Sequence, residues 1–305
     1  MTGAGDLGWV PLMSDIPPTP IPLADVLRRA TERLTEAGVV DAQVDAELLA
    51  AHVLSIRRGA VQAAAVRGDP LGAPDAERLD ALVARRATRE PLQHLTGSAP
   101  FRHLELRVGP GVFVPRPETE MVAQLAIDAL AAAASPAPIA VDLGTGSGAI
   151  ALALATEVPH ARVFAAENSV DAYVWTKENF ALVGADNAEL AFIDLEHAFP
   201  DLDGLVSVVA SNPPYVPDEA IPRDPEVRFF DPPAALYGGT DGLDVVRVVS
   251  RVGLRLAHPG GMIVIEHGEW QGPAVRELLT ADGWRAASTH PDLTMRDRAT
   301  TAIRP

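Results

Sequence analysis

The stretch Val141-Asp142-Leu143-Gly144-Thr145-Gly146-Ser147-Gly148 (residues 141–148) decides the fold of the part of the chain that carries it. It leaves an apolar run at 139–143 and enters a helical pattern at 149–156. Glycines let a backbone turn sharply between a strand and a helix, and approach a ligand where a side chain would clash. The stretch therefore predicts a strand, a tight turn and a helix. The turn either binds a ligand or only reverses the chain.

Short apolar runs and helical patterns alternate through the rest of the chain after Pro138. The apolar runs are residues 139–143, 162–166, 190–193, 205–210 and 262–265, with further segments near 285–289 and 299–303. The helical patterns are residues 149–156, 170–183 and 242–257. Such alternation is typical of a mostly parallel sheet with helices on both faces, so we predict an α/β fold.

A helical region precedes this sheet. Residues 1–22 are punctuated by Gly and Pro without a periodic pattern, which is typical of a flexible tail. Over 23–90, apolar residues recur at helical spacing and predict a small bundle whose helices begin at Leu23, at Asp41 and after Pro74. The bundle carries no set of side chains typical of catalysis. We expect it to bind a protein substrate, the alternative being that it only covers the sheet.

A linking β-hairpin is predicted between the bundle and the sheet, over 91–117. Apolar and polar residues largely alternate over 101–108, and Gly109-Pro110-Gly111 then turns the chain into Val112-Phe113-Val114. This pattern predicts two strands joined at the Gly-Pro-Gly turn. A helix is expected to start at Pro117 and to open the last domain, 118–305.

The composition excludes several classes of function. The 305 residues include 41 acidic and 25 basic side chains and no cysteine, so disulfides, cysteine-ligated metals and thiol nucleophiles are excluded. Residues 113–305 carry −14 of the net charge of −16, which disfavours nucleic acid, because Lys and Arg must neutralise its phosphates. No apolar run approaches the roughly 20 residues of a membrane helix, and no signal-like start is present. We expect a cytoplasmic protein without a membrane span.

Two carboxylates follow the next two predicted strands and strengthen the ligand interpretation of the turn. Glu167 ends the second strand, where a carboxylate can accept both hydroxyl hydrogens of a ribose. Asp194 ends the third, near where the base of a nucleoside would lie. Residues 144–149 also match the dinucleotide pattern G-x-G-x-x-A, so a nicotinamide enzyme is an alternative at this point.

The fourth predicted strand runs directly into Asn212-Pro213-Pro214-Tyr215. Prolines have a fixed φ and stiffen a loop, and the ends of such strands are where α/β sheets bind ligands. Asn212 Oδ1 and the Pro213 carbonyl can then form a pair of acceptors for a planar –NH₂ group, with Tyr215 covering its flat face. The alternative is an ordinary loop, for which Asn and Pro are common residues.

The turn and the Asn-Pro-Pro-Tyr loop together look like the methyltransferases that transfer a methyl group from S-adenosylmethionine to amino groups conjugated to a π system. Further motifs are Pro91-Leu92-Gln93-His94-Leu95-Thr96-Gly97, Val114-Pro115-Arg116-Pro117-Glu118-Thr119-Glu120, Glu226-Val227-Arg228-Phe229-Phe230-Asp231-Pro232, Leu236-Tyr237-Gly238-Gly239 and Glu266-His267-Gly268. With them, about residues 23–305 resemble the protein-(glutamine-N5) methyltransferases of class-1 peptide chain release factors, the HemK-type family.

This resemblance implies a Rossmann-like class I S-adenosylmethionine-dependent methyltransferase sheet and S-adenosyl-L-methionine as cofactor. It implies methylation of the glutamine in the Gly-Gly-Gln motif of release factors, which modulates translation termination. The residues implied beneath the methionine part of the cofactor are Gly144, Thr145, Gly146, Ser147 and Gly148. Glu167 would hold the ribose, and Asp194 and Leu195 would border the adenine.

On the same resemblance, Asn212 would touch both cofactor and substrate, and the loop through Tyr215 would hold the glutamine. The residues implied as catalytic are Asn212, Pro213 and Tyr215, and Pro214 completes the substrate-binding set. The chain departs from the family in two places: Glu167 stands where Asp is common, and Leu195 where many members have an aromatic residue. The second departure implies weaker stacking on the adenine.

The roles of Arg116, Glu118 and Glu120 are left open by the sequence. Their motif favours the release-factor enzyme over the relative that methylates a ribosomal protein. The structural alternative is that acidic groups simply favour a helix start and that the arginine pairs with them. His267 lies beside two carboxylates, but such groups at a strand end are more often an ordinary polar rim, so no metal is expected.

Three other functions compete with the glutamine methyltransferase of release factors. A glutamine methyltransferase of a ribosomal protein is the nearest, and an adenine-N6 methyltransferase of nucleic acid would need a basic groove. A binding module without activity would not explain two motifs at adjacent strand ends. The expected partner is a class-1 release factor, with no membrane and no direct nucleic-acid binding, and the chain is expected to be a monomer.

Overall fold

The structure, a computed structural model, describes residues 21–305. These form two units, one ending at Leu92 and the other starting at Gln93. Residues 1–20 of the predicted tail lie outside the described part. The prediction is wrong for the last two tail residues, since Ile21–Pro22 forms strand β1 and pairs antiparallel with β2 (Pro70–Leu71).

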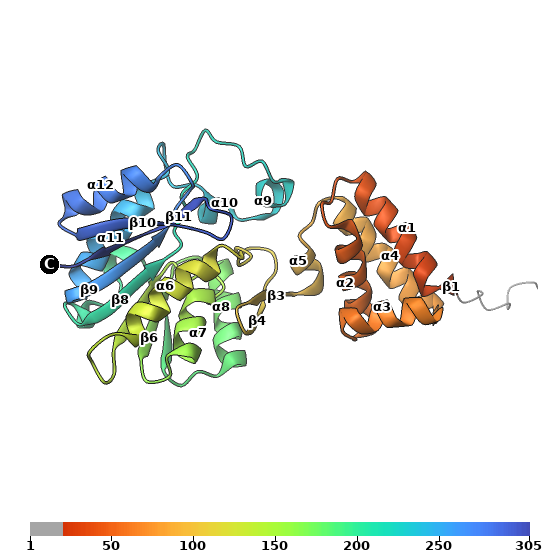
Figure 1. Cartoon of the computed structure of the whole chain (residues 1–305), viewed down its shortest axis with the longest axis horizontal. Helices are drawn as coiled ribbons and strands as arrows, with labels where there is room; N and C mark the ends of the chain where they lie inside the picture. Colours follow the sequence, from red (N-terminus) through yellow and green to blue (C-terminus); the bar gives the residue numbers. More distant parts are fainter. Residues whose placement is uncertain (1–20) are drawn as a thin grey trace, which may run out of the picture. The chain divides into compact units, whose positions relative to one another are not determined.

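Four helices build the first unit (Figure 1): α1 (Leu23–Glu36), α2 (Ala42–Leu54), α3 (Arg58–Arg67) and α4 (Ala73–Ala87). Three of them confirm the predicted helices, and α3 was missed because only Val61 and Ala64 of its residues are buried. Polar contacts hold α3 in place. The buried Glu47 carboxylate of α2 accepts hydrogen bonds from Arg58 Nε at 2.7 Å and Gln62 Nε2 at 2.8 Å.

A seven-stranded sheet organises the second unit, in the order β10-β11-β9-β8-β5-β6-β7. Its parallel strands are β5 (Ile139–Leu143), β6 (Arg162–Glu167), β7 (Ala188–Phe192), β8 (Val206–Ser211) and β9 (Ala257–Glu266), and its antiparallel edge is β10 (Arg285–Pro291) and β11 (Asp297–Ile303). The predicted strands and the mostly parallel sheet are confirmed.

Both faces of the sheet are buried under helices. Successive side chains of a strand point to opposite faces, so the apolar residues of these strands need cover on both sides. Along β5, Ala140 faces a cluster that includes α6 (Thr119–Ala131) and α7 (Ala149–Glu157), whereas Val141 faces one that includes α11 (Asp244–Leu256) and α12 (Gly272–Asp282). The helix α8 (Val170–Val183) connects β6 to β7. Of these helices, α12 was not predicted.

The strand order reverses between β5 and β8. From β5 the chain moves outward to β6 and β7, and it then returns to place β8 on the other side of β5. Crevices that bind ligands form at the carboxyl ends of strands at such a switch point. Both motifs singled out in the sequence follow these two strands, so the topology brings them together.

The hairpin lies in the second unit and is placed differently from the prediction. Its strands are β3 (Ser98–Phe101) and β4 (Leu104–Arg107), and the turn is Arg102-His103 instead of Gly109-Pro110-Gly111. Arg102 has a φ of 55°, which an arginine rarely adopts. Its guanidinium donates to the Glu157 carboxylate and to Gln124 Oε1, the latter at 2.8 Å, so tertiary contacts stabilise a turn that has no turn-forming residues.

Shorter helices complete the chain: α5 (Leu92–Thr96), α9 (Pro225–Phe230) and α10 (Pro233–Leu236). Two single turns, η1 (Leu195–His197) and η2 (Pro200–Leu202), lie between β7 and β8. The helix expected at Pro117 begins at Thr119. Among residues 21–305, no helix has both the length and the apolar character needed to cross a membrane.

Candidate active site

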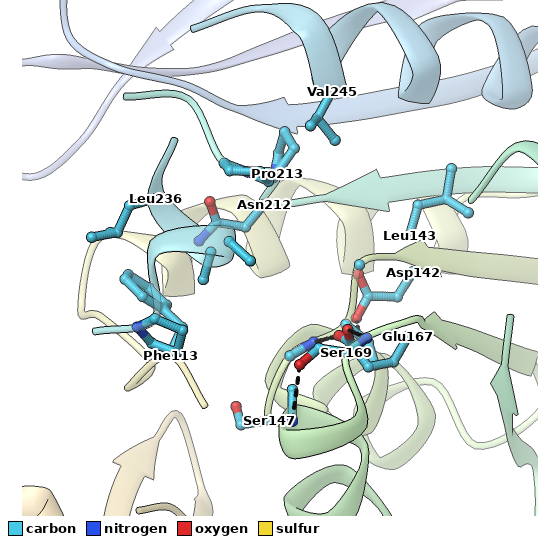
Figure 2. Close-up of a pocket in the computed structure, with 18 of the residues that line it drawn as sticks. Phe113, Asp142, Leu143, Ser147, Glu167, Ser169, Asn212, Pro213, Leu236 and Val245 are labelled. Atoms are coloured by element: carbon cyan, nitrogen blue, oxygen red, sulfur yellow. Dashed lines mark hydrogen bonds between the residues drawn. The ribbon is translucent and has the colours of Figure 1, made fainter. Parts of the chain in front are cut away.

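A cavity of about 620 Å³ lies at the carboxyl ends of β5, β6 and β8. Of the predicted site residues, those lining it are Gly144, Thr145, Gly146, Ser147, Glu167, Asp194, Leu195, Asn212, Pro213, Pro214 and Tyr215. Figure 2 shows the cavity with Asn212 and Pro213 on one side and Asp142, Glu167 and Ser169 on the other. The structure thus brings the turn and the Asn-Pro-Pro-Tyr loop to one cavity.

The glycine turn presents open space to this cavity. Gly144 and Gly146 have φ values of 74° and 58°, which favour glycine, and a Cβ at either position would meet no atom within 4 Å. Gly148 is different, because it is not among the cavity-lining residues and its added Cβ would lie 3.1 Å from Phe180. Gly148 therefore allows close packing of α7 against α8, while the other two glycines leave room for a ligand.

A buried carboxyl group, which was not assigned from the sequence, lies beneath the turn. Asp142 is 1 % exposed, and its Oδ2 accepts hydrogen bonds from Thr145 Oγ1 at 2.6 Å and Ala151 N at 3.1 Å. Its Oδ1 has no hydrogen-bond partner in the described part of the chain. Burial raises the pKa of Asp142 to about 7. Asp142 lines the cavity, and a buried polar atom without a partner calls for an explanation such as a bound ligand.

Glu167 closes the other end of the turn. Its Oε2 accepts from Gly146 N at 2.8 Å, and its Oε1 accepts from Asn168 N at 3.0 Å and Ser169 N at 2.8 Å (Figure 2). Burial raises its pKa, and the three backbone donors oppose that shift. The Glu167 side chain, which is longer than the aspartate common in the family, thus holds the glycine turn against the end of β6.

The third strand end contributes a polar edge. Asp194 accepts from Glu196 N at 3.0 Å and thereby caps η1, and it also accepts from Asn168 Nδ2 at 3.2 Å. The next residue, Leu195, lines the cavity beside it. At this edge of the cavity, Leu195 offers an apolar contact and Asp194 a hydrogen-bond acceptor, a combination that suits a flat ligand group with a polar rim.

On the opposite side, side chains from separate elements meet behind the loop. Asn212 Nδ2 donates to Thr119 Oγ1 at 3.3 Å, and the Tyr215 hydroxyl donates to Glu266 Oε1 at 3.3 Å. Glu266 is 1 % exposed, and burial raises its pKa to about 7. Burial and the Glu266 charge also raise the pKa of the Tyr215 phenol. Thr119 and Glu266 belong to motifs quoted from the sequence, but the sequence alone assigns a role to neither.

Close backbone approach supports the loop from behind. A Cβ on Gly238 would lie 2.5 Å from the Pro214 carbonyl oxygen, and one on Gly242 would lie 2.2 Å from the Tyr215 carbonyl oxygen. Val216 and Tyr237 form a parallel bridge at the same place. These contacts leave no room for larger residues at Gly238 and Gly242, so residues 237–242 pack closely against the loop between β8 and Val216.

The segment that follows forms the outer wall. Val227, Pro232 and Leu236 line the cavity, and Phe113 faces them from the region after the hairpin. An ion pair fastens this wall: Arg116 Nη2 lies 2.6 Å from Asp231 Oδ2, whose side chain is fully buried. No local pattern predicts this pair, because its partners are 115 residues apart in the chain.

The structure places the remaining motif residues as follows. Arg116 pairs with Asp231 and stacks 5.0 Å from the centre of the Phe113 ring, so it does not pair with its acidic neighbours as the structural alternative held. Glu118 precedes α6 and lines the cavity, whereas Glu120 Oε1 accepts from the Arg102 backbone at 2.9 Å. His267 is buried, and its Nε2 lies 2.8 Å from Thr300 Oγ1.

The site fits S-adenosylmethionine on its own features. The open space over Gly144 and Gly146 leaves room for a ligand, Asp142 Oδ1 has no hydrogen-bond partner among residues 21–305, and the Glu167 carboxylate lines the same cavity. Asn212 and Pro213 both line this cavity, and the acceptor pair predicted from them would have no role in a nicotinamide reaction. The geometry therefore favours methyl transfer over hydride transfer.

Comparisons with known proteins agree with this geometry. Residues 25–97 match the PrmC N-terminal domain, and residues 103–235 match the methyltransferase small domain. The release factor glutamine methyltransferase of Streptomyces coelicolor is 50 % identical over 92 % of this chain and 97 % of its own length. That of Mycolicibacterium smegmatis is 42 % identical over 92 % and 98 %.

Two other proteins are also similar to this chain, one in sequence and one in structure. The 4-amino-L-phenylalanine/4-methylamino-L-phenylalanine methyltransferase of Streptomyces pristinaespiralis is 39 % identical over 92 % of this chain and 95 % of its own. The Thermus thermophilus 16S rRNA N2 G1207 methyltransferase, solved with AdoMet and guanosine, has a TM-score of 0.51 at 19 % identity, covering 68 % of this chain and 50 % of its own. This likeness shows the fold alone. The identities above show that the chain belongs to the release factor glutamine methyltransferase family, and that it is an S-adenosylmethionine-dependent methyltransferase.

Proposed function

We propose that this protein methylates the side-chain amide nitrogen (N5) of the glutamine in the Gly-Gly-Gln motif of class-1 peptide release factors, and thereby modulates translation termination. One observation carries the proposal: the Asn212–Tyr215 loop and the glycine turn line the same cavity. The relatives named for this activity support the choice of a glutamine amide as acceptor.

On the cofactor side, we assign roles to the residues that line the cavity. Gly144, Thr145, Gly146 and Ser147 would pass beneath the methionine part, with the adjoining Gly148 shaping the turn, and Asp142 Oδ1 would face its ammonium group. Glu167 would accept the ribose hydroxyls. Asp194 and Leu195 would border the adenine. When bound, S-adenosylmethionine supplies a sulfonium methyl group, which is a strong electrophile.

On the acceptor side, the chain must activate a poor nucleophile, because the amide lone pair is delocalised into its carbonyl. Asn212 Oδ1 and the Pro213 carbonyl would accept the two –NH₂ hydrogens and direct the nitrogen at the methyl group, with Tyr215 and Pro214 against the flat faces. Alignment of this kind is worth on the order of 7–11 kcal/mol. As the nitrogen gains positive charge, its hydrogens become better donors, so these contacts strengthen in the transition state. The displaced proton passes to water.

The first unit would bind the release factor. Residues 25–97 match the PrmC N-terminal domain, and the net charge of residues 1–112 is only −2, which excludes neither an acidic nor a basic protein partner. We expect amide hydrogen exchange in 23–90 to slow when a release factor is added to the full-length protein. Protection confined to 93–305 would mean that the bundle does not bind the substrate.

The test of the proposal is methyl transfer from labelled S-adenosylmethionine to a class-1 release factor. A factor with the Gly-Gly-Gln glutamine changed to Ala is the control, and ribosomal protein, DNA and free 4-aminophenylalanine are the competing substrates. Label on the first factor and none on the Ala variant is the expected result. Label only on a competing substrate would contradict the proposed substrate while keeping the family.

We further propose that the protein acts as a cytoplasmic monomer that does not bind nucleic acid directly. The charge of −14 over residues 113–305 supports the last point, because it repels phosphates. Sedimentation at micromolar concentration should give the mass of one chain. RNA added at low salt should leave that mass unchanged.

A further inference from the structure

Two loops of the second unit hold large apolar side chains in solvent. Leu293 and Met295 lie in the loop between β10 and β11 and are 100 % and 80 % exposed, and Trp270 lies in the loop between β9 and α12 and is 85 % exposed. Single exposed apolar residues are normal on a protein surface, whereas a group of them marks an interaction site. We call Trp270, Leu293 and Met295 the apolar patch.

The two loops that carry the apolar patch are neighbours. Strand β11 pairs antiparallel with β9, so the loop before β11 and the loop after β9 lie at the same edge of the sheet. An ion pair joins them, with Arg296 Nε 3.7 Å from Glu269 Oε2. Arg296 directly follows Met295, and Glu269 directly precedes Trp270. The three apolar side chains therefore belong to one surface.

The loop between β10 and β11 is held in one shape by a buried carboxylate. Asp292 Oδ1 accepts hydrogen bonds from Thr294 N at 2.7 Å, from Thr294 Oγ1 at 2.6 Å and from Arg296 N at 3.2 Å. Met295 has a φ of 64°, which a residue with a side chain rarely adopts. This shape leaves Leu293 and Met295 outside the core. A loop already held in one conformation loses little entropy when a partner covers it.

The apolar patch adjoins the acceptor side of the cavity. Strands β8 and β9 pair in parallel, so the loops that follow them lie at one edge of the sheet. Gln271, which follows Trp270, accepts from Gly268 N at 2.8 Å and donates through its Nε2 to the Tyr215 carbonyl oxygen at 3.0 Å. Tyr215 lines the cavity. A protein whose glutamine enters this cavity must therefore place its neighbouring residues against the same edge.

We infer that the apolar patch is a docking surface for the class-1 release factor, which covers Trp270, Leu293 and Met295 with an apolar surface of its own while its glutamine lies in the cavity. This inference rests on the proposed function and adds to it a contact on the catalytic unit. Trp and Met are enriched at protein interfaces. The three side chains are uncharged, and the charges of Arg296 and Glu269 beside them balance. The contact should therefore persist at raised salt, unlike an electrostatic one.

The test is methyl transfer to a class-1 release factor by a full-length variant that combines Trp270→Ser, Leu293→Ser and Met295→Ser. The KM for the release factor should rise by about tenfold or more, because exposed aromatic and apolar anchors carry much of the affinity of an interface. The rise should be as large at raised salt as at low salt. At saturating release factor, kcat should stay within about twofold of wild type, and the Kd of S-adenosylmethionine should not change.

The matched control combines Leu182→Ser and Leu205→Ser, two half-exposed positions on the same unit. Leu182 lies in the last turn of α8, before β7, and Leu205 directly precedes β8, so both lie at the opposite edge of the sheet. This variant should keep the wild-type KM. Met295→Gly separates docking from folding, because glycine accepts the positive φ. It should keep or raise the melting temperature while it raises KM.

Three results would overturn the inference. The first is a wild-type KM in the triple variant. The second is a loss of kcat and of S-adenosylmethionine affinity as large as the rise in KM, which would mean that the two loops only support the cavity. The third is a wild-type dimer that the triple variant converts to monomers without a change in KM, since the patch would then join two copies of the chain. If wild type itself does not methylate the release factor, the proposed function has failed, and the inference fails with it.

Discussion

The two sides of the cavity are built in different ways. The cofactor side consists of a short continuous stretch, residues 142–147, with backbone groups fastened by one carboxylate, Glu167. The acceptor side consists of side chains from three segments far apart in the chain, because Asn212 and Tyr215 of the loop contact Thr119 and Glu266, respectively. A backbone site depends on local conformation, whereas a side-chain site depends on the packing of the whole sheet.

The largest effect is expected where this difference is tested directly, at Asn212. Asn212→Ala removes the proposed acceptor, and we expect kcat to fall on the order of 100-fold or more, as for the loss of one transition-state hydrogen bond. The Kd of S-adenosylmethionine, measured by calorimetry, should change by less than about threefold. Equal losses in turnover and cofactor affinity would contradict the separation of the two sides.

The converse change affects the cofactor side alone. Gly146→Ala adds a methyl group that faces the cavity and a backbone strain of roughly 1–2 kcal/mol, and cofactor affinity should fall about tenfold or more. Gly184→Ala is the matched control, because Gly184 has a similar φ of 63°, also has no atom within 4 Å of an added Cβ, and lies outside the cavity lining. Both variants should lose similar thermal stability. A matching loss of affinity in the control would show that strain alone, and not the cavity, is responsible.

Asp142 allows a test by stability. Its pKa is about 7 in the folded protein and near 3.8 in an unfolded chain, so the folded state holds a proton more tightly between these pH values. The free energy of unfolding therefore falls as the pH rises from about 4 to about 7. Above pH 7 the protein keeps this loss of stability, because Asp142 is then ionised in both states. Asp142→Asn should raise stability at pH 8 by on the order of 2 kcal/mol and change it little near pH 4.

The control for this variant is Asp186→Asn, which removes one negative charge at an exposed position. Its melting temperature should follow wild type at both pH values. Cofactor affinity of Asp142→Asn should fall even as its stability rises, because the free oxygen of Asp142 loses its charge. A variant that is no more stable at pH 8 than wild type would mean that Asp142 is readily ionised in the fold.

The same contrast explains what could be predicted from the sequence. The strand Ile139–Leu143 and the helix Val170–Val183 follow from apolar periodicity, which is a local property, and both are found. The hairpin turn at Arg102 could not be predicted from local sequence. The positive φ of this arginine is stabilised by Glu157, which is 55 residues away in the chain. The helix α3 was missed for a related reason, since polar contacts to Glu47 hold it in place of an apolar face.

The site residues also differ in whether local sequence could predict them. The lining role of Gly144 and Glu167 could be expected from their places at strand ends, since parallel strands end at one edge of the sheet. The contact of Thr119 with Asn212 could not, because it depends on where the first turn of α6 packs against β8 and β9. The identities of Thr119 and Asn212 alone do not determine the distance between their side chains.

The smallest effect is expected at Leu195, on the cofactor side. An aromatic ring in its place would stack on the adenine, and a favourable ring pair adds about 0.5–1.5 kcal/mol beyond burial. Leu195→Phe should therefore tighten S-adenosylmethionine binding by about two- to tenfold, measured by calorimetry, with kcat almost unchanged. Leu205→Phe, at a half-exposed position outside the cavity lining, is the matched control and should leave the Kd as it is. Leu195→Phe adds an aromatic ring to the cofactor side of the cavity alone. Weaker binding of S-adenosylmethionine by this variant would therefore show that the adenine does not lie against Leu195.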